Sequence, residues 1–280
     1  MSWFVLILIS ISFFVCYSLL SRALAIKSDN PRAFAVVYNF FCSLIFLGLW
    51  LLGDRAFKSI DSQILFLTFI ATVLWGVFSW VEYYAKKNVE ESLLTIITKV
   101  AELTTFMAAI LFLGEMITSK KILAATLILG ANVCLFYKKK GGIKGRGLIY
   151  ALITAIFLGL SWTMDKKISV FYPTSLYVLL VTSIPTLYIM TIPPLPIKAV
   201  KKEFRRTSWK VILLAFFSSL GYYFLVKSFA FGEASRIILV FSTRSIFTII
   251  AAIIFLKERT DIPKKIIAGA AVTAGILLLK

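Results

Sequence analysis

The stretch ESLLTIITKVAELTTFMAAILFL, residues 91–113, has the length and composition of a helix that crosses a membrane. With a rise of 1.5 Å per residue, about 20 apolar residues span the hydrocarbon core of a bilayer. Only Lys99 and Glu102 interrupt the apolar centre of this stretch. Because charge at that depth is unfavourable without a partner or a function, these two residues also mark a candidate site.

The rest of the chain has the same character. Apolar residues make up 60% of its 280 residues, charged residues make up 16%, and the mean hydropathy is +0.93. A soluble domain of this length needs far less apolar content. Ten apolar segments with short polar connections are found at residues 2–21, 31–52, 62–85, 91–113, 118–137, 147–164, 174–197, 209–230, 234–256 and 262–279. The sequence therefore predicts an all-α, polytopic membrane protein with ten transmembrane helices.

The residue types that are missing restrict the chemistry. The chain has no histidine, which removes Ser-His triads, histidine proton relays and the usual zinc sites. Cys16, Cys42 and Cys134 fall inside apolar segments at unrelated spacings, so they suggest small buried side chains. No phosphate-loop motif is present. We therefore expect a protein that is not an enzyme and that uses no cofactor and no metal.

A basic linker, KKKGGIKGRG at residues 138–147, separates two halves of five apolar segments each. The halves resemble each other: at a spacing of 145 residues, Lys99 corresponds to Arg244 and Gly76 to Gly221. We predict a first five-helix repeat at 1–137, a linker at 138–146 and a second repeat at 147–280. Because five is an odd number, the second repeat must enter the membrane from the opposite face. Inverted repeats of this kind enclose a central substrate site in transporters.

Each half also contains a short shared element, FLGE at 112–115 and FLKE at 255–258, followed by a polar turn and a helix rich in small residues. In these features the chain resembles the drug/metabolite transporter superfamily, in its EamA-like branch. The resemblance covers the whole chain and implies secondary transport of a small metabolite by alternating access, as efflux or exchange. Organophosphate translocators of that superfamily are similar in placing basic residues on helices four and nine, which here are Lys99 and Arg244.

Lys99 and Arg244 are the main candidates for substrate binding. Both lie near the centre of their segments, and an ammonium and a fork-shaped guanidinium suit a phosphate or carboxylate. Glu102 is three residues from Lys99 and can meet it on one helix face. The alternative is purely structural: Lys99 and Glu102 neutralise each other, Arg244 finds Glu82 or a carbonyl group, and the set fixes helix packing.

Further candidates are polar or aromatic residues inside the other apolar segments. The substrate-binding candidates are Tyr17, Tyr38, Asn39, Thr98, Trp162, Tyr222 and Thr243. Glu82 and Lys227 correspond across the repeat and are candidates for coupling or gating. The competing interpretation of the aromatic residues is lipid-facing bulk or an interfacial belt, and Lys227 can extend to the interface. Glu115 and Glu258 end helices and are expected to be structural.

The sequence favours a secondary transporter of a small anionic or zwitterionic metabolite. One alternative is a proton-coupled exporter of neutral amino acids or drug-like metabolites, with Glu82 or Glu102 as the protonation site. A membrane-embedded lipid-modifying enzyme is a weaker alternative, because no cluster of acidic residues or histidine marks an interface. A channel is the third alternative, but it needs a repeated filter or a ring of charge, which one duplicated chain supplies poorly.

The expected partners are a small-molecule substrate and the lipid bilayer, and the chain acts as a monomer or homodimer. The net charge of +18 does not indicate nucleic acid, because Lys and Arg gather in loops beside membrane segments. The odd-numbered loops hold 20 Lys and Arg, against 7 in the even-numbered loops with Lys280. This bias places the odd-numbered loops in the cytoplasm and both termini outside, whereas the family resemblance implies cytoplasmic termini. The expected location is the plasma (inner) membrane of a prokaryote.

Overall fold

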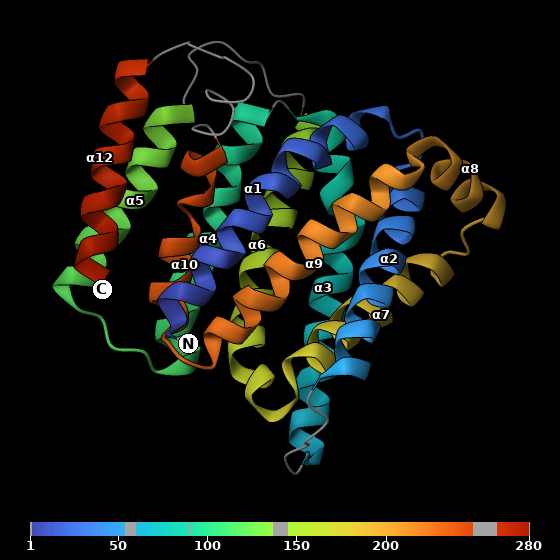
Figure 1. The fold of residues 1–280 in the computed structure, drawn as a ribbon, viewed down its shortest axis with the longest axis horizontal. Helices are drawn as coiled ribbons and strands as arrows, with labels where there is room; N and C mark the ends of the chain where they lie inside the picture. Colours follow the sequence, from blue (N-terminus) through green and yellow to red (C-terminus); the bar gives the residue numbers. More distant parts are fainter. Residues whose placement is uncertain (1, 54–59, 90, 137–144, 249–261, 280) are drawn as a thin grey trace.

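The computed structural model describes residues 2–53, 60–89, 91–136, 145–248 and 262–279. These residues form a helical bundle without strands, which confirms the predicted fold class (Figure 1). The helices are α1 (Trp3–Lys27), α2 (Pro31–Leu52), α3 (Ser62–Asn88), α4 (Glu91–Leu113), α5 (Ser119–Phe136), α6 (Gly145–Ile168), the 3-10 helix η1 (Ser169–Phe171), α7 (Thr174–Thr191), α8 (Ile197–Thr207), α9 (Trp209–Phe229), α10 (Ala234–Phe241) and α12 (Ile262–Leu279).

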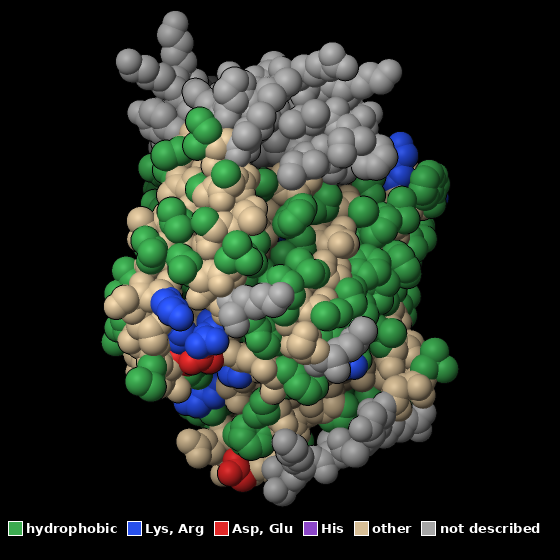
Figure 2. All heavy atoms as spheres, turned by 60° about the vertical axis from the view of Figure 1, so that its left-hand side comes forward, with side chains coloured by type: hydrophobic (Ala, Val, Ile, Leu, Met, Phe, Trp, Pro, Cys, Tyr) green, Lys and Arg blue, Asp and Glu red, His purple; other side chains and the backbone are tan. Residues whose placement is uncertain are grey.

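Five stretches of the described chain are long and apolar enough to cross a membrane. They are Pro31–Leu52, Ser62–Asn88, Gly147–Phe171, Thr174–Thr191 and Trp209–Phe229. Shorter apolar helical stretches lie at Trp3–Ser18 and Ile267–Leu279. Figure 2 shows one flank of the bundle, where hydrophobic and uncharged atoms cover most of the described surface and charged side chains gather toward the ends. Such a surface suits contact with lipid chains.

The seventh helix ends earlier than predicted. We predict an apolar segment at 174–197, but α7 stops at Thr191 because Pro193 and Pro194 cannot continue its hydrogen bonding. The buried Arg32 of α2 satisfies carbonyl groups freed at this end: its Nε donates to the Ile189 carbonyl at 2.8 Å, and its Nη2 donates to the carbonyls of Ile189 and Pro193. The chain then forms α8, a short helix that the sequence pattern did not predict.

The ninth predicted helix, 234–256, is interrupted. Helix α10 ends at Phe241, Ser242 and Thr243 form a turn, and helical structure resumes at Arg244. Side chains that bond back to the main chain favour this break, because Thr243 Oγ1 donates to the Val240 carbonyl at 2.7 Å and Ser245 Oγ to the Ser242 carbonyl at 2.9 Å. Residues 249–256 of this segment, Glu258, and most of the predicted linker lie outside the described residues.

Many contacts between helices recur when each helix is replaced by its counterpart in the other half. Helices α1, α2, α3, α4 and α5 correspond to α6, α7, α9, α10 and α12. The contact of α3 with α6 then corresponds to that of α9 with α1, and the contact of α4 with α6 to that of α10 with α1. The pairs α2 with α7, α4 with α10 and α5 with α12 map onto themselves. This pattern is expected of two repeats related by a two-fold axis.

The corresponding helices run in opposite directions. Lys166, near the end of α6, donates to the carbonyl of Gly232 at 2.8 Å, and Gly232 packs against Trp3 at the start of α1. The end of α6 therefore lies beside the beginning of α1, where the N-terminus is marked in Figure 1. The second half is inverted relative to the first.

Close approach of the two halves requires a glycine in α6. A Cβ atom on Gly159 would lie 2.5 Å from the carbonyl oxygen of Ala101 and 2.6 Å from Cβ of Thr104, both in α4. The contact also contains a hydrogen bond, because Thr105 Oγ1 donates to the Gly159 carbonyl at 3.0 Å. Small residues and hydroxyl groups of this kind are typical of helix contacts inside membranes.

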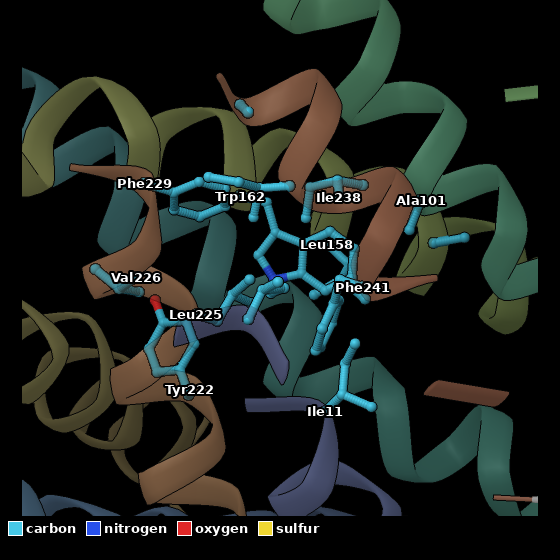
Figure 3. Close-up of a cluster of buried hydrophobic side chains, with 14 of the residues drawn as sticks. Ile11, Ala101, Leu158, Trp162, Tyr222, Leu225, Val226, Phe229, Ile238 and Phe241 are labelled. Atoms are coloured by element: carbon cyan, nitrogen blue, oxygen red, sulfur yellow. The ribbon is translucent and has the colours of Figure 1, made fainter. Parts of the chain in front are cut away.

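The apolar core around the middle of the bundle is drawn from both halves. Figure 3 shows Trp162 of α6 among side chains of α1, α9 and α10. The rings of Trp162 and Phe241 lie edge to face with centroids 5.6 Å apart. This aromatic cluster forms part of the wall of the site described next.

Candidate functional site

A cavity of about 280 Å³ lies between the two halves. Its lining comes from α1, α2, α3 and α4 of the first repeat and from α6, α7, α9 and the segment after α10 of the second. It reaches Lys86 in the last turn of α3 and Leu94 in the first turn of α4, which lie at the end of the bundle with the odd-numbered loops. None of the lining residues comes from the last turn of α6 or α9, at the opposite end.

Lys99 lies at the wall of this cavity and joins the two repeats. Its Nζ donates to Glu102 Oε1 at 3.0 Å on the same helix. It also donates to the carbonyl oxygen of Ser242 at 3.2 Å and to Ser242 Oγ at 3.3 Å. The Ser242 carbonyl belongs to the turn that interrupts the ninth segment, so the break supplies an acceptor for the ammonium group.

Arg244 follows this turn and lines the same cavity. Its Nη2 lies 3.8 Å from Glu102 Oε1, which is an ion pair but too long for a hydrogen bond. The guanidinium group lies 4.0 Å from the ring centroid of Phe241 and 5.6 Å from that of Trp162. The side chain is 18% exposed, whereas Glu102 is fully buried. Arg244 therefore presents donors to the cavity that no described residue accepts.

A second charged cluster lines the cavity near the odd-numbered loops. Lys86 Nζ lies 2.6 Å from Glu82 Oε1 and donates to the hydroxyl of Tyr17 at 2.8 Å. The Tyr17 hydroxyl in turn donates to Glu82 Oε1 at 3.3 Å. These contacts tie α1 to α3 with no net charge.

Most predicted site residues line this same cavity. Lys99, Arg244, Tyr17, Tyr38, Asn39, Thr98, Trp162, Tyr222 and Glu82 all belong to its wall. They come from six helices and from the segment after α10. Tyr38 and Ser218 share a hydrogen bond between α2 and α9, which again joins the halves.

Three predicted residues are not among those that line the cavity. Glu102 lies behind the wall, between Lys99 and Arg244. Thr243 is fully buried and its hydroxyl group bonds to the main chain. Lys227 lies away from the lining, with its Nζ 5.5 Å from the ring centroid of Tyr223.

Two charged residues of the site were missed because both lie just beyond the predicted ends of their segments. Lys86 precedes Lys87, a pattern that also marks the interfacial end of a helix, but α3 continues to Asn88. Asp165 directly follows the predicted sixth segment, 147–164, and precedes Lys166 and Lys167. The twist of the helix turns Asp165 inward, which a hydropathy window cannot detect.

Asp165 is fully buried and links four helices. Its Oδ1 accepts from Trp75 Nε1 of α3 at 3.0 Å and from the Tyr177 hydroxyl of α7 at 2.7 Å. Its Oδ2 accepts from the Tyr222 hydroxyl of α9 at 2.9 Å. In the described part of the chain, no Lys or Arg pairs with it. Because Trp75 and Tyr222 line the cavity, this carboxyl group orients two side chains of the wall from behind.

Other polar contacts join the halves at the end opposite the odd-numbered loops. Glu115, from the FLGE element, accepts from the main-chain nitrogens of Ala234 at 2.6 Å and Ser235 at 3.0 Å, which caps the start of α10. Lys121 of α5 lies 3.1 Å from Glu233. The structural role expected of Glu115 agrees with this geometry.

Comparison with known families gives a match over both halves. The model described as "EamA-like transporter family" matches residues 1–137 and again residues 145–280. The chain belongs to the EamA-like transporter family. The resemblance inferred from FLGE and FLKE is thereby confirmed, and the protein is an integral, multi-pass membrane protein. The family is described as one of transporters.

A solved structure has a similar fold. It is titled only "Crystal structure of protein", has 11% sequence identity and gives a TM-score of 0.76 over 99% of this chain and 96% of that chain. At this identity the likeness shows the fold alone. A comparison with curated protein sequences finds no significant match.

Proposed function

We propose that this EamA-like protein is a secondary transporter that moves a small anionic or zwitterionic metabolite across the membrane by alternating access, as efflux or exchange. The observation that supports it most is the shared position of Lys99 and Arg244. They come from corresponding helices of opposite repeats and line one cavity between the halves. Inverted-repeat transporters place their substrate sites at such an interface.

The cavity has a net positive charge, which favours a ligand with a net charge of −1 or a ligand with a carboxylate group. Lys86, Lys99 and Arg244 contribute three positive charges, and Glu82 with the adjoining Glu102 contributes two negative ones. Glu82 is already paired with Lys86. The net positive charge therefore lies at Lys99 and Arg244, where the guanidinium of Arg244 has donors available for two oxygen atoms of a carboxylate or phosphate.

The size and walls of the cavity favour a small metabolite. A volume of about 280 Å³ is at the lower limit of pockets that hold drug-sized ligands, roughly 300 Å³. Trp75, Trp162 and Tyr222 offer aromatic surface opposite the charged groups. An amino acid, a small carboxylate or a small phosphate ester fits these dimensions better than a drug-like molecule.

In this mechanism the substrate enters from the end with the odd-numbered loops, binds Arg244 and Lys99, and leaves at the other end after the halves rock. The far end is held together by Asp165, Glu115 and Lys121 in contacts between the repeats. Those contacts must open during transport.

The test is transport by purified protein in liposomes. Radiolabelled inorganic phosphate, sugar phosphates and small carboxylates are compared with neutral amino acids in uptake and counterflow. We expect an anionic or zwitterionic probe to be transported. Arg244→Gln should reduce its transport about 10- to 100-fold, since a hydrogen bond to a charged group is worth about 1.5–3 kcal/mol. Arg244→Lys should fall between Arg244→Gln and the parent.

The matched control is Lys120→Gln, which removes a positive charge from an exposed position of α5 far from the cavity lining. It should transport at the parent rate. If well-folded Arg244→Gln and Lys99→Gln proteins transport like the parent, the site assignment is wrong.

A proton-coupled exporter of a neutral metabolite is the second candidate, and Asp165 favours it. A buried carboxyl group beside the cavity wall, with no cationic partner in the described ranges, is a suitable proton carrier. The same liposomes distinguish the two candidates when a pH gradient is imposed. Accumulation of a neutral amino acid that depends on the gradient supports proton coupling, and anion exchange that does not depend on it supports the first proposal.

The proposed location is the plasma (inner) membrane of a prokaryote, with the odd-numbered loops in the cytoplasm because they carry most of the Lys and Arg. The description of the family favours transport over the lipid-modifying enzyme.

A further inference from the structure

Helix α8 differs from the other helices that the structure describes. Five of its 11 residues are Lys or Arg, whereas the spanning helices have few charges. It connects α7 to α9, and Figure 1 shows it at the outer edge of the bundle, beside the upper ends of α2 and α9. A short helix between two spans must lie at the membrane surface.

The side chains of α8 divide into three arcs around the helix. Glu203 and Thr207 are buried and face the bundle, with Ala199 and Val200 beside them. Glu203 Oε1 accepts from the main-chain nitrogens of Asp29 at 2.9 Å and Asn30 at 3.0 Å, which fixes α8 to the loop before α2.

The second arc is apolar and exposed. Ile197 and Phe204 are 60% and 42% exposed and lie on one side of the buried arc. The ring of Phe204 packs on Phe41, 5.6 Å between centroids, and Phe41 lies about three turns inside the spanning helix α2. The apolar arc therefore lies at the depth of the lipid chains.

The third arc is basic and divides into two groups. Lys202 and Arg206 pair with Asp29 at 3.0 and 2.5 Å. Hydrogen bonds from Arg206 and Lys202 lower the pKa of the Asp29 carboxyl to about 2, so this ion pair persists at neutral pH. Lys198, Lys201 and Arg205 are exposed, adjoin the apolar arc, and have no ion-pair or hydrogen-bond partner among the described residues.

We propose that Lys198, Lys201 and Arg205 of α8 form a binding site for the headgroups of anionic phospholipids in the leaflet that faces the odd-numbered loops. The apolar arc enters the lipid chains, which holds the three cationic side chains at the level of the phosphate groups. Cations at this depth attract anionic lipid through charge complementarity. The site is separate from the central cavity, so it does not depend on the proposed substrate.

The experiment titrates the detergent-solubilised protein with phosphatidylglycerol or phosphatidylcholine of identical acyl chains, and native mass spectrometry counts the bound lipids. We expect the parent to prefer phosphatidylglycerol. Lys201→Gln combined with Arg205→Gln should reduce that preference about fivefold for each charge removed. Lys201→Arg combined with Arg205→Lys keeps both charges and should bind like the parent.

The matched control, Lys120→Gln with Lys167→Gln, removes the same charge from exposed positions at the opposite end of the bundle. It should keep the preference of the parent. The proposal is wrong if the parent binds both lipids equally, if the α8 variant keeps its preference, or if the control loses as much as the α8 variant. The last result would assign the preference to the net charge of the chain.

Discussion

At the scale of single residues, the buried charges differ in how their partners compensate them. The Glu102 carboxylate lies between Lys99 and Arg244, and their positive charges compensate its negative charge. Among the residues that the structure describes, Asp165 is compensated by hydrogen bonds alone, from one indole and two phenol groups. A carboxyl group in a membrane protein needs one of these two solutions, because an unpaired polar group there loses its hydration without replacement.

The Asp165 network predicts a difference between two substitutions. Asp165→Leu leaves the donors of Trp75, Tyr177 and Tyr222 without an acceptor, and each buried unsatisfied group costs about 1–3 kcal/mol. Asp165→Asn keeps one acceptor oxygen and should cost much less. Thermal unfolding in detergent, followed by tryptophan fluorescence, measures both variants. Equal melting temperatures for the two variants would show that the network does not hold these helices together.

At the scale of elements, helix α4 of the first repeat packs on α6 of the second without room for a side chain at Gly159. The break in the helix after α10 shapes the site. It turns Arg244 into the cavity, and it leaves the Ser242 carbonyl available to accept a hydrogen bond from Lys99. Both features depend on a glycine and on a group of Ser and Thr side chains, whose packing and hydrogen bonding a hydropathy average does not describe.

The close contact at Gly159 predicts that even a methyl group is harmful. Gly159→Ala should destabilise the protein by about 1–3 kcal/mol, because its Cβ would meet the Ala101 carbonyl oxygen at 2.5 Å and the backbones must separate. Gly48→Ala in α2 is the control, since no described atom beyond the local helix backbone lies within 4 Å of the added Cβ. It should be neutral or slightly stabilising because alanine favours helices. The melting temperatures of both variants, measured in the same detergent, test this predicted difference in stability.

At the scale of the whole molecule, the lining of the cavity reaches the end with the odd-numbered loops and stops short of the other end. Polar contacts join the repeats at both ends, such as Arg32 with Ile189 at the first and Glu115 with Ala234 at the second. In the proposed mechanism, this asymmetry of the lining corresponds to one of the two states that alternating access requires. In that mechanism, the two-fold exchange of helix contacts would give the same chain a second, oppositely open state.

The asymmetry can be tested with cysteines in a background where Cys16, Cys42 and Cys134 are replaced by Ser. Ser18→Cys lies in the cavity wall, and Ser119→Cys is exposed at the opposite end of the bundle. A thiol reagent that cannot cross membranes, applied to right-side-out or inverted vesicles, should label the two positions from opposite sides. Labelling of both from the same side contradicts the described state.

The same experiment decides the orientation. Labelling of Ser119→Cys in intact cells places both termini outside, as the distribution of Lys and Arg predicts. Labelling of that position only in inverted vesicles places the termini in the cytoplasm, as the family resemblance implies.

Local features of the sequence predict the membrane class, the two halves, their inverted relation and the family. These properties follow from apolar length, an odd number of segments and the FLGE and FLKE elements, which are local and can be counted along one chain. The sequence also predicts Lys99 and Arg244 as candidates, because a charge stands out where every neighbour is apolar.

The packing of the helices in three dimensions, in contrast, sets which side chains meet. Lys86 and Asp165 are next to helix ends in the sequence, and their inward direction depends on where each helix ends and how it is rotated against its neighbours. The position of Glu102 behind the wall, the turn before Arg244 and the attachment of α8 to Asp29 are likewise set by contacts between distant segments. Periodicity along one helix carries no information about the partner across the interface, and that partner determines whether a buried charge is exposed to the cavity or neutralised.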